Sequence, residues 1–412
     1  MQHFNKVIIG GGIAGVTCGR ELAKKGEDNF LLLEAKSNLG GRMATLKRSD
    51  GDIVNLGGEL INADHTLMQR LTNEAGLELV QVYQDRPRER YVYDGVQDLK
   101  IALAPFIRRL ELDTKLAQSD PAHREYLTKL PLRQYLDEIN ISDFGKRVVL
   151  DYAELMYGVS SLTAGCLIEL NMDEGRLLSP GADKFMIGGG SQGLVEKLAE
   201  RVRVNVNMPV TGIERTSAGY YEITVSSGGV IACDKLVIAA PLTTVRDIDL
   251  TKADLPKDYI EAIQKARYGE SKKVIPYFAG AHDLKSSFIF SESLKAQIWE
   301  NGKGTNKNGM AVTIFLGADS SIDGWWSHNR NQFASEFPDL PYLPGNVYVK
   351  DWTEDPYAKG SYHVGDQDPI IKKVERLKDP FEGIHFAGEH VGGSGYMEFA
   401  ACSGIETARK IK

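Results

Sequence analysis

The chain has 412 residues, of which 42% are hydrophobic and 25% are charged, and its formal net charge at pH 7 is −7. This balance is ordinary for a globular protein and excludes a wholly disordered or fibrous chain. The excess of acidic residues argues against a nucleic-acid-binding protein, because such proteins need a basic surface. The length corresponds to roughly two to three domains.

The sequence gives no sign of export or membrane insertion. It contains no stretch of about 18 consecutive apolar residues, and it enters the apolar run at Val7 without the parts of a signal peptide. Its four cysteines are far apart without a CxxC pattern, so they predict neither a disulfide framework nor a zinc site (Cys18, Cys166, Cys233, Cys402). We therefore expect a cytoplasmic protein that holds no metal.

The first motif lies in a strand–turn–helix unit. Lys6–Ile9 predicts a buried strand, and the apolar positions from Ile13 to Lys25 recur at helical spacing. Between them, Gly10-Gly11-Gly12-Ile13-Ala14-Gly15 contains the G-x-G-x-x-G pattern. In this pattern the first glycine permits a sharp turn, the second lets the backbone approach a pyrophosphate, and the third lets the helix pack against the sheet.

An acidic residue completes the unit. Phe30–Leu33 predicts a second apolar strand, and Glu34 follows it, where a carboxylate can accept hydrogen bonds from ribose hydroxyls. Strand, glycines, helix, strand and acid together predict a dinucleotide site, in preference to a tight turn of another α/β fold. The unit alone does not distinguish NAD from FAD.

The residues that follow favour FAD. Leu39-Gly40-Gly41-Arg42-Met43 places two more glycines and an arginine just after the acid. Together with Glu34, this segment resembles the second glycine motif of the flavin amine oxidase family, which includes monoamine oxidases, polyamine oxidases and L-amino acid oxidases. The resemblance implies that Arg42 faces the pyrophosphate and the isoalloxazine region of FAD.

Shorter elements follow this motif. A strand is predicted at Asp52–Leu56, leading into Gly57-Gly58-Glu59, and a helix at His65–Gly76. Residues 79–183 are densely charged, and we expect a mostly helical insert there, with three runs of helical periodicity (Ile101–Leu116, Leu132–Ile139, Phe144–Leu155).

The second half of the chain alternates between strand-like and helical patterns. Ile187–Gly193 opens a helix, and Val202–Ile238 predicts several short strands separated by turns. Residues from about 256 to 380 contain further strand-like runs (Lys273–Phe278, Ala311–Leu316). Within them, Asn301–Asn308 predicts a surface hairpin loop because it is rich in Asn, Gly and Lys.

The resemblance implies a mixed α/β (α+β) fold in which two domains interleave. A Rossmann-like FAD-binding domain is expected from residues 1–78, 184–255 and 382–412. A substrate-binding domain, with a β-sheet and the helical insert, is expected from residues 79–183 and 256–381. The pocket should lie between the two domains, where a cleft can bury a flavin face and exclude water.

The C-terminal segment resembles the closing motif of the family. Ile384–Phe386 predicts a strand, and Gly388-Glu389 and Gly392-Gly393-Ser394-Gly395-Tyr396-Met397 lead into a helix. By resemblance, Gly388-Glu389 approaches the ribityl chain and the backbone at Met397 meets the flavin O2 side. A helix N-terminus there would stabilise the negative charge of a reduced flavin.

Two tyrosines are expected to enclose the substrate. Tyr396 matches one wall of the aromatic cage of monoamine oxidases, and Trp352–Tyr362 resembles the W-x-x-x-P-Y-x-x-G-x-Y motif that places Tyr362 at the other wall. Two aromatic faces make a slot that admits a small amine and strips its water. Each tyrosine taken alone would more often be a half-buried core residue.

Three positions refine the expected chemistry. Animal monoamine oxidases have, at the position of Ser361, a Cys that binds FAD covalently, so this chain should bind FAD non-covalently. L-amino acid oxidases have, at the position of Leu60, an Arg that holds the substrate carboxylate. The family register places at Lys273 a Lys that holds a water near flavin N5, while its neighbour Lys272 points to the opposite face of the strand.

The role of Glu59 is open. An acid at this position could attract the second ammonium of a diamine, or it could be a surface acid or a hydrogen-bonding acid of the flavin domain. The resemblance therefore gives a set of expected catalytic, substrate-binding and FAD-binding residues (catalytic: Lys273, Tyr362, Tyr396; substrate: Glu59, Tyr362, Tyr396; FAD: Gly10, Gly12, Ile13, Ala14, Gly15, Glu34, Ala35, Gly41, Arg42, Gly57, Gly58, Glu59, Val210, Trp352, Gly388, Glu389, Tyr396, Met397).

The expected activity is FAD-dependent oxidation of an amine to an imine by hydride transfer to flavin N5. The imine then hydrolyses to a carbonyl compound plus ammonia or a smaller amine, and O2 or another acceptor reoxidises the flavin, O2 giving H2O2. The expected partners are a small-molecule amine and the acceptor, with no nucleic acid, and the protein is expected to be a monomer or a homodimer.

Three alternatives remain. One is an amino acid oxidase or dehydrogenase that uses another arginine, from the Arg86–Arg90 or Arg108–Arg109 cluster. Another is a carotenoid- or porphyrinogen-type FAD oxidoreductase, whose substrates have no amine for an aromatic cage to select. The third is a flavin-binding protein with a regulatory role.

Overall fold

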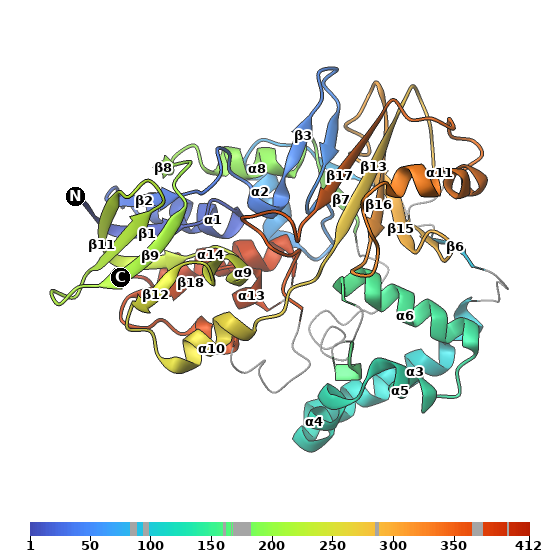
Figure 1. Ribbon diagram of the computed structural model, residues 1–412, viewed down its shortest axis with the longest axis horizontal. Coiled ribbons are helices and arrows are strands. Elements are labelled where there is room, and N and C mark those ends of the chain that lie inside the picture. The colour runs from blue at the N-terminus through green and yellow to red at the C-terminus, as the bar shows by residue number, and fades with distance from the viewer. Residues whose placement is uncertain are drawn as a thin grey trace.

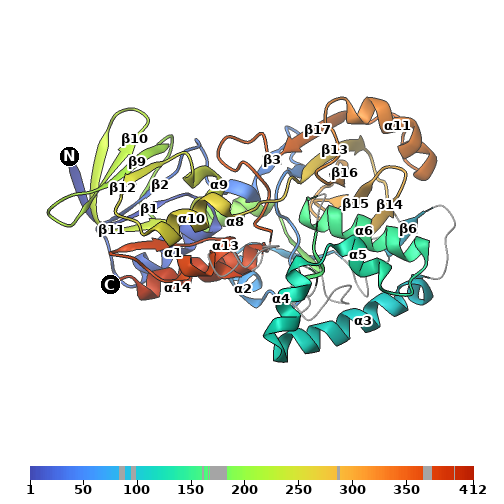
Figure 2. The same ribbon diagram turned by 60° about the horizontal axis from the view of Figure 1, so that its bottom comes forward.

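The computed structural model describes residues 1–82, 89–93, 99–159, 162–165, 167, 183–284, 288–364, 374–393 and 395–412, with backbone alone for 89–91 and 99–100. The chain forms two lobes, each built around a β-sheet (Figure 1). Both chain ends lie in one lobe, and the second lobe adds a group of helices beside its sheet, as the turned view shows (Figure 2).

Within the described residues, eight strands form the first sheet, in the order β12-β9-β10-β11-β1-β2-β8, with β18 paired to β11. β1, β2, β11 and β18 run parallel. β2 is four consecutive buried apolar residues, which is typical of a strand covered on both faces. The strands are β1 (Gln2–Ile9), β2 (Phe30–Leu33), β8 (Val204–Asn205), β9 (Val210–Arg215), β10 (Tyr221–Val225), β11 (Val230–Ile238), β12 (Asp249–Lys252) and β18 (Ile384–Phe386).

Helices cover both faces of this sheet. Ile8 packs into the core formed with α1, α8 and α14, whereas its neighbours Val7 and Ile9 pack into the core on the other face, with α9 and α10. This alternation follows from the two-residue period of a strand. The elements are α1 (Ile13–Lys24), η1 (Gly41–Met43), α2 (Thr66–Glu74), α8 (Ser191–Leu198), α9 (Leu242–Val245), α10 (Lys257–Lys265), η2 (Arg376–Lys378), α13 (Glu389–Gly392) and α14 (Met397–Lys410).

The first and last helices pack closely against each other. A Cβ on Gly404 of α14 would lie 2.1 Å from the Ala14 carbonyl oxygen of α1, so only glycine permits this approach. The Thr17 hydroxyl donates to the Ala401 carbonyl at 3.1 Å. The C-terminal helix therefore completes the lobe that the N-terminal strand begins.

The second sheet has the order β17-β13-β16-β15-β14-β6 among the described residues. Helix α11 (Trp325–Glu336) packs on it, with the Phe333 ring stacked 6.2 Å from that of Phe278. Its strands are β6 (Glu89–Val92), β13 (Lys272–Ala279), β14 (Phe288–Ser291), β15 (Ala296–Asn301), β16 (Gly309–Leu316) and β17 (Asn346–Asp351), and two small antiparallel pairs complete the described strands: β3 (Thr45–Lys47) with β4 (Ile53–Asn55), and β5 (Leu79–Gln81) with β7 (Phe185–Ile187).

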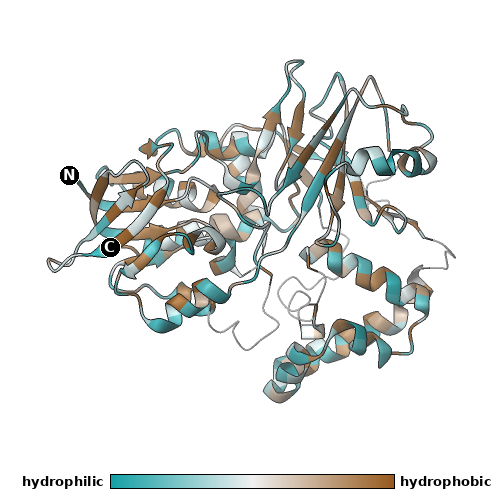
Figure 3. Cartoon of the chain, viewed as in Figure 1, coloured by the Kyte–Doolittle hydropathy of each residue, from teal (hydrophilic) through white to brown (hydrophobic). Residues whose placement is uncertain are grey.

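The helical insert comprises α3 (Leu99–Ser119), α4 (Pro121–Lys129), α5 (Leu132–Asp137) and α6 (Asp143–Tyr157). Polar and apolar residues alternate along these helices in the hydropathy colouring (Figure 3), and the three predicted helical periodicities are confirmed. The buried carboxylate of Asp113 joins the helices by accepting from Arg109 Nε at 2.6 Å and from the Tyr135 hydroxyl at 3.0 Å. Across the described part of the chain, no helix combines the length and apolar character needed to cross a membrane.

The Asn301–Asn308 segment differs in part from its prediction. It does connect two antiparallel strands, β15 and β16, and its loop residues Gly304, Lys307 and Asn308 are exposed. Asn301, however, is the last residue of β15 and is only 1% exposed. The backbone amides of Lys307 and Gly309 donate to the buried Asp52 carboxylate at 2.9 and 3.0 Å. The buried acid before β4 thus holds the end of a hairpin about 255 residues further along the chain, a long-range contact that composition does not reveal.

Candidate active site

A cavity of about 420 Å³ is lined by residues of both lobes. Almost all of the predicted site residues line it, although they come from distant parts of the sequence (Gly10, Gly12, Ile13, Ala14, Glu34, Ala35, Gly41, Arg42, Gly57, Gly58, Glu59, Val210, Lys273, Trp352, Tyr362, Gly388, Glu389, Tyr396, Met397). Gly15 is the one predicted residue that is not among the lining residues, and its packing explains why.

The three motif glycines have distinct roles. Gly10 has φ +112°, and a Cβ there would lie 2.9 Å from the Ala239 carbonyl carbon at the end of β11. A Cβ on Gly15 would lie 2.0 Å from Gly10 O, so Gly15 allows the helix to pack against the turn. A Cβ on Gly12 would meet no atom within 4 Å and would project into open space. Gly12 therefore leaves room at the N-terminus of α1, where an anionic group is favoured.

Glu34 is tied to the same turn. Its Oε2 accepts from Gly11 N at 2.6 Å and its Oε1 accepts from Lys36 N at 2.8 Å. Burial raises the pKa of Glu34, while these amide donors oppose that shift. The carboxylate lines the cavity at the end of β2, where the sequence analysis expects ribose hydroxyls.

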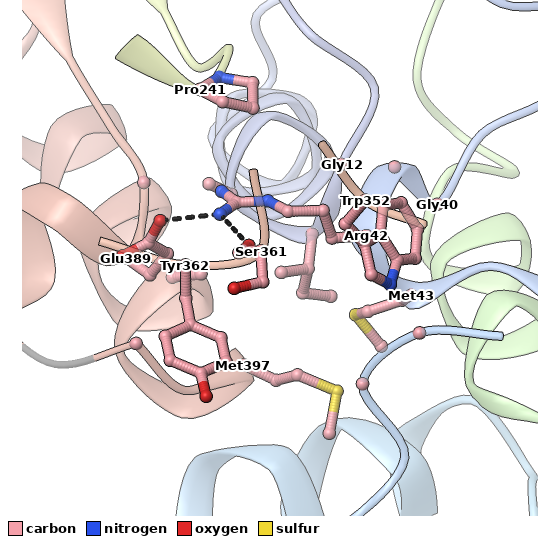
Figure 4. Close-up of a pocket in the computed structure, with 18 of the residues that line it drawn as sticks. Gly12, Gly40, Arg42, Met43, Pro241, Trp352, Ser361, Tyr362, Glu389 and Met397 are labelled. Atoms are coloured by element: carbon pink, nitrogen blue, oxygen red, sulfur yellow. Dashed lines mark hydrogen bonds and ion pairs between the residues drawn. The ribbon is translucent and has the colours of Figure 1, made fainter. Parts of the chain in front are cut away.

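Arg42 bridges two C-terminal segments. Its Nη1 donates to Glu389 Oε1 at 2.8 Å and to the Ser361 carbonyl at 2.6 Å, as the close-up of the cavity shows (Figure 4). Burial disfavours the ionised Glu389, but the adjacent Arg42 guanidinium outweighs burial and holds the pKa of Glu389 below its ordinary value. The Glu389 carboxylate also accepts from His363 N at 3.2 Å. The guanidinium is thereby fixed beside the glycine turn.

A buried cluster beside this pair was not found by the sequence analysis. Leu242 N donates to the Tyr268 hydroxyl at 3.1 Å, and that hydroxyl lies 3.2 Å from His390 Nδ1. Burial lowers the pKa of His390 to about 3, so the ring is neutral. No short sequence motif predicts this cluster, because its members come from different segments of the chain and come together only in the folded structure.

The two predicted cage tyrosines line the same cavity. The Tyr362 hydroxyl donates to the Met156 carbonyl near the end of α6, and burial raises the pKa of this phenol to about 12. The ring of Tyr396 meets His65 edge-on at 5.0 Å. A Cβ on Gly395 would lie 3.0 Å from Tyr362 Cβ, so the glycine before Tyr396 permits its segment to approach Tyr362.

Ser361 is held by neighbouring groups rather than presented freely to the cavity. Its hydroxyl donates to the Gly269 carbonyl at 2.9 Å and accepts from the Ser271 hydroxyl at 3.0 Å. Both donor and acceptor capacities are used within the protein. Nothing in this arrangement activates the oxygen as a nucleophile.

Lys272 and Lys273 occupy opposite faces of β13. Lys272 Nζ donates to the Ala318 and Ser320 carbonyls at 3.0 and 2.8 Å, whereas Lys273 lines the cavity. Lys273 Nζ donates to Glu59 Oε1 at 2.8 Å. The Glu59 carboxylate is thus already paired with a cation, and it also accepts from Asn55 Nδ2 at 3.2 Å. A hydrogen-bonding role for Glu59 was one of the two interpretations, but its pairing with Lys273 was not predicted.

Apolar side chains line the cavity beyond these polar groups. Four of them come from α6 and the second sheet and belong to no sequence motif (Met156, Phe288, Trp299, Phe315). Trp299 and Phe315 lie on adjacent strands with ring centroids 5.7 Å apart. Their common location depends on strand pairing, which motif spacing does not predict.

The arginines suggested for an amino acid substrate are not part of the described lining. Arg108 is exposed on α3, and Arg109 is paired with Asp113. Of the Arg86–Arg90 cluster, residues 86–88 lie outside the described residues, as do the side chains of 89 and 90. Among the described lining residues the one guanidinium is that of Arg42, which is held by Glu389.

The cavity fits a dinucleotide with a flavin at one end. The open space at Gly12 and the N-terminus of α1 suit a pyrophosphate, and Glu34 stands where a ribose would lie. Gly57 and Gly58 form a side-chain-free wall: a Cβ on Gly58 would come 3.3 Å from Met397 Sδ. The ring nitrogens Nε2 of His363 and His390 are buried with no protein partner among the described residues, and both histidines line the cavity.

Comparisons with known proteins agree with this geometry. The sequence matches the family described as flavin containing amine oxidoreductase over residues 13–412. It is 24% identical over 450 residues to flavin-containing amine oxidase A of Canis lupus familiaris, covering 99% of this chain and 85% of that protein. It is 26% identical over 452 residues to nicotine dehydrogenase of Pseudomonas putida (strain DSM 28022 / S16), covering 99% and 88%.

Solved structures share the fold. Cyclohexylamine oxidase from Brevibacterium oxydans IH-35A has a TM-score of 0.85 and 20% identity, covering 99% of this chain and 98% of that one. Wild-type putrescine oxidase bound to putrescine has a TM-score of 0.83 and 18% identity, covering 99% of both chains. The chain belongs to the flavin-containing amine oxidoreductase family. It is a flavin-dependent amine oxidoreductase, and the predicted family and mixed α/β fold are confirmed.

Proposed function

We propose that this chain binds FAD non-covalently and oxidises an amine to an imine, which hydrolyses to a carbonyl compound plus ammonia or a smaller amine. The observation that carries the proposal is that the glycine turn and two tyrosines line one cavity, together with an apolar wall. A dinucleotide site and an aromatic amine slot are therefore adjacent. The family membership supports the same reaction class.

FAD bound in this cavity would supply the acceptor for a hydride equivalent at N5 and would pass the electrons to O2, giving H2O2. The protein contributes binding, orientation and charge. Arg42 and the N-terminus of α1 favour the pyrophosphate, and the N-terminus of α14, which begins at Met397, favours negative charge near the flavin end. We infer that FAD is bound non-covalently because Ser361 offers no free nucleophile for a covalent bond: its hydroxyl is hydrogen-bonded to Gly269 and Ser271.

The tyrosines orient the substrate and exclude water. Tyr362 is fixed by its hydrogen bond to Met156, and Tyr396 by its contact with His65. Aromatic faces held in this way accept an amine with little loss of side-chain entropy, and they attract a cationic amine as it enters. The amine reacts as the neutral base, so no general base is assigned.

The apolar wall favours a monoamine with an apolar body. Trp299 and Phe315 would contact such a body, and burying it contributes roughly 25 cal/mol per Å² of apolar area. The carboxylate of Glu59, the group that a second ammonium would need, is 2% exposed and already bonded to Lys273. We therefore infer that diamines are poor substrates, although a putrescine oxidase shares the fold.

The proposal is tested by anaerobic titration of the purified yellow protein with amines. We expect a monoamine with an aromatic or cyclic body to bleach the flavin absorbance, and air to restore it with one equivalent of H2O2. Putrescine and L-amino acids serve as comparison substrates. Bleaching by L-amino acids but by no amine would replace the proposal with an amino acid oxidase, and a purified protein that takes up no FAD would overturn it.

A further inference from the structure

The Glu59–Lys273 pair is buried in the wall between the two lobes. Glu59 follows the glycines after β4, and Lys273 lies on β13 of the second sheet; their side chains are 2% and 6% exposed. Lys273 Nζ lies 2.8 Å from Glu59 Oε1. Both residues line the cavity. A buried pair of this kind is costly unless each partner has its remaining hydrogen-bonding capacity satisfied.

The ammonium of Lys273 meets that condition. Besides Glu59, its Nζ donates to the Gly57 carbonyl at 2.7 Å and lies 3.4 Å from the Asn55 carbonyl. An ammonium has three protons and no lone pair, so three protein oxygens account for all of its donors. The lysine is thus held in one direction, against the backbone of residues 55–57.

The carboxylate of Glu59 accepts hydrogen bonds at both of its oxygens. Oε1 also accepts from Trp299 Nε1 at 3.0 Å, and Oε2 accepts from Asn55 Nδ2 at 3.2 Å. Asn301 Nδ2 and the Thr313 hydroxyl lie 3.4 Å from Oε1. These donors come from β4, β15 and β16, so three strands hold the carboxylate in place.

We propose that Glu59 is the positioning residue of Lys273: it holds the lysine as a fixed ammonium against the Gly57 carbonyl, so that the cavity wall carries a neutral ion pair instead of a free cation. This inference rests on the proposed FAD-binding function. It gives the hydrogen-bonding role of Glu59 a specific partner, in place of the second ammonium of a diamine. The charge at this point of the wall is then set by Glu59 and Lys273 together.

The pair sets the local charge that a bound flavin experiences. Charge near the flavin ring tunes its electronics, and reduction of the flavin adds negative charge to it. With Glu59 replaced by Gln, the ammonium would be uncompensated and would stabilise the reduced form. With Lys273 replaced by Met, the carboxylate would be uncompensated and would destabilise that form. Removing both charges would restore the neutral wall.

The test is a double-mutant cycle on the midpoint potential of the bound flavin, measured by spectroelectrochemistry. Glu59→Gln should shift the potential upward, Lys273→Met should shift it downward, and the double variant should return close to the parental value. Lys272→Met is the matched control, because its ammonium donates to Ala318 and Ser320 on the opposite face of β13; it should leave the potential unchanged. Lys273→Arg, which keeps the charge, should stay nearer the parental value than Lys273→Met.

A purely structural role gives a different pattern. In that case both single variants would lower the urea midpoint of unfolding, but their flavin potentials would not move in opposite directions, and this outcome overturns the inference. Equal shifts for Lys273→Arg and Lys273→Met would also overturn it. If the variants bind flavin but their midpoint potentials do not differ, this inference alone is contradicted. If the parental protein binds no flavin, both the proposed function and the inference are contradicted.

Discussion

Arg42 and Glu389 are 347 positions apart in the sequence, and Arg42 Nη1 donates to Glu389 Oε1 at 2.8 Å. Glu389 begins α13, separated from the end of β18 by two residues, while Arg42 lies in the short helix η1 within the second glycine motif. The same guanidinium nitrogen also donates to the Ser361 carbonyl. One arginine therefore joins the beginning of the chain to two of its C-terminal segments at the cavity.

Breaking this pair should destabilise the protein. In Glu389→Leu the Arg42 guanidinium would remain largely buried without its counter-charge, and breaking a buried pair typically costs about 3–5 kcal/mol of unfolding free energy. Urea denaturation without flavin measures that loss. The double variant Arg42→Met/Glu389→Leu should recover part of it, and Glu200→Gln, from an exposed pair with Lys197, should cause little change. Equal stability of the single and double variants would contradict the prediction.

Two glycines of the first motif, Gly12 and Gly15, should respond differently to the same substitution by alanine. Gly12→Ala places a methyl group in open space, so the protein should fold with nearly parental stability while its affinity for FAD falls by about tenfold or more, because that space suits a pyrophosphate. Gly15→Ala would place a Cβ 2.0 Å from Gly10 O and should lower the urea midpoint instead. Flavin titration of both apoproteins measures the difference. Parental FAD affinity in Gly12→Ala would show that no phosphate lies there.

Local patterns predicted much of the fold. The predicted strand Phe30–Leu33 has the same bounds in the structure, because a run of four apolar residues between two turns strongly favours a buried strand of that length. The Asn301–Asn308 segment was predicted less well, since its backbone is held by Asp52, a residue far away in the sequence. Local composition indicates a turn, but it does not show which distant carboxylate binds that turn.

Prediction of the candidate site is limited in the same way, because some of its residues come together only through long-range contacts. The glycine motifs and the tyrosine motifs carry their own signals, and their residues line one cavity. Trp299 and Phe315 carry no motif, and they reach the cavity through the pairing of β15 with β16. The partner of Glu59 was also missed, because strand alternation places Lys273 on one face without saying what it meets. The division into domains and the roles of individual site residues stay predictions.

Buried histidines should make the protein sensitive to mild acid. Burial lowers the pKa values of His385 and His65 to about 4 and of His390 to about 3. Between these values and the ordinary value of 6.5, the unfolded chain binds more protons than the folded one, so stability rises with pH. Each histidine contributes up to about 1.4 kcal/mol per pH unit in that window.

The measurement is urea denaturation of the apoprotein from pH 7.5 down to about 5, a window set by the unfolded-state histidine value. The free energy of unfolding should fall as the pH drops below about 6.5. His385→Phe, on β18, should reduce the slope, and the exposed residue His328 provides the control His328→Gln. An unchanged slope in His385→Phe would mean that this imidazole is not held neutral.

The mode of flavin attachment can be tested by acid precipitation. Because the Ser361 hydroxyl is engaged with Gly269 and Ser271, we expect trichloroacetic acid to release all of the flavin into the supernatant. Absorbance at the flavin maximum, measured in the supernatant and in the redissolved pellet, gives the ratio of released to retained flavin. Mass spectrometry of the denatured chain is the control, and a mass increase equal to FAD would contradict non-covalent binding.

The last prediction tests whether Tyr362 and Tyr396 orient the substrate for reaction with the flavin. Tyr362→Ala and Tyr396→Ala should each retain FAD, because neither hydroxyl is needed for the glycine turn, yet each should slow anaerobic flavin reduction by an amine about 10- to 100-fold through loss of orientation. Tyr362→Phe keeps the aromatic face and loses only the hydrogen bond to the Met156 carbonyl, so its rate should stay closer to the parental one. Tyr342→Ala, at an exposed tyrosine, controls for the loss of an aromatic side chain elsewhere. If both alanine variants were reduced at the parental rate in stopped-flow measurements, the two rings would not form the substrate slot.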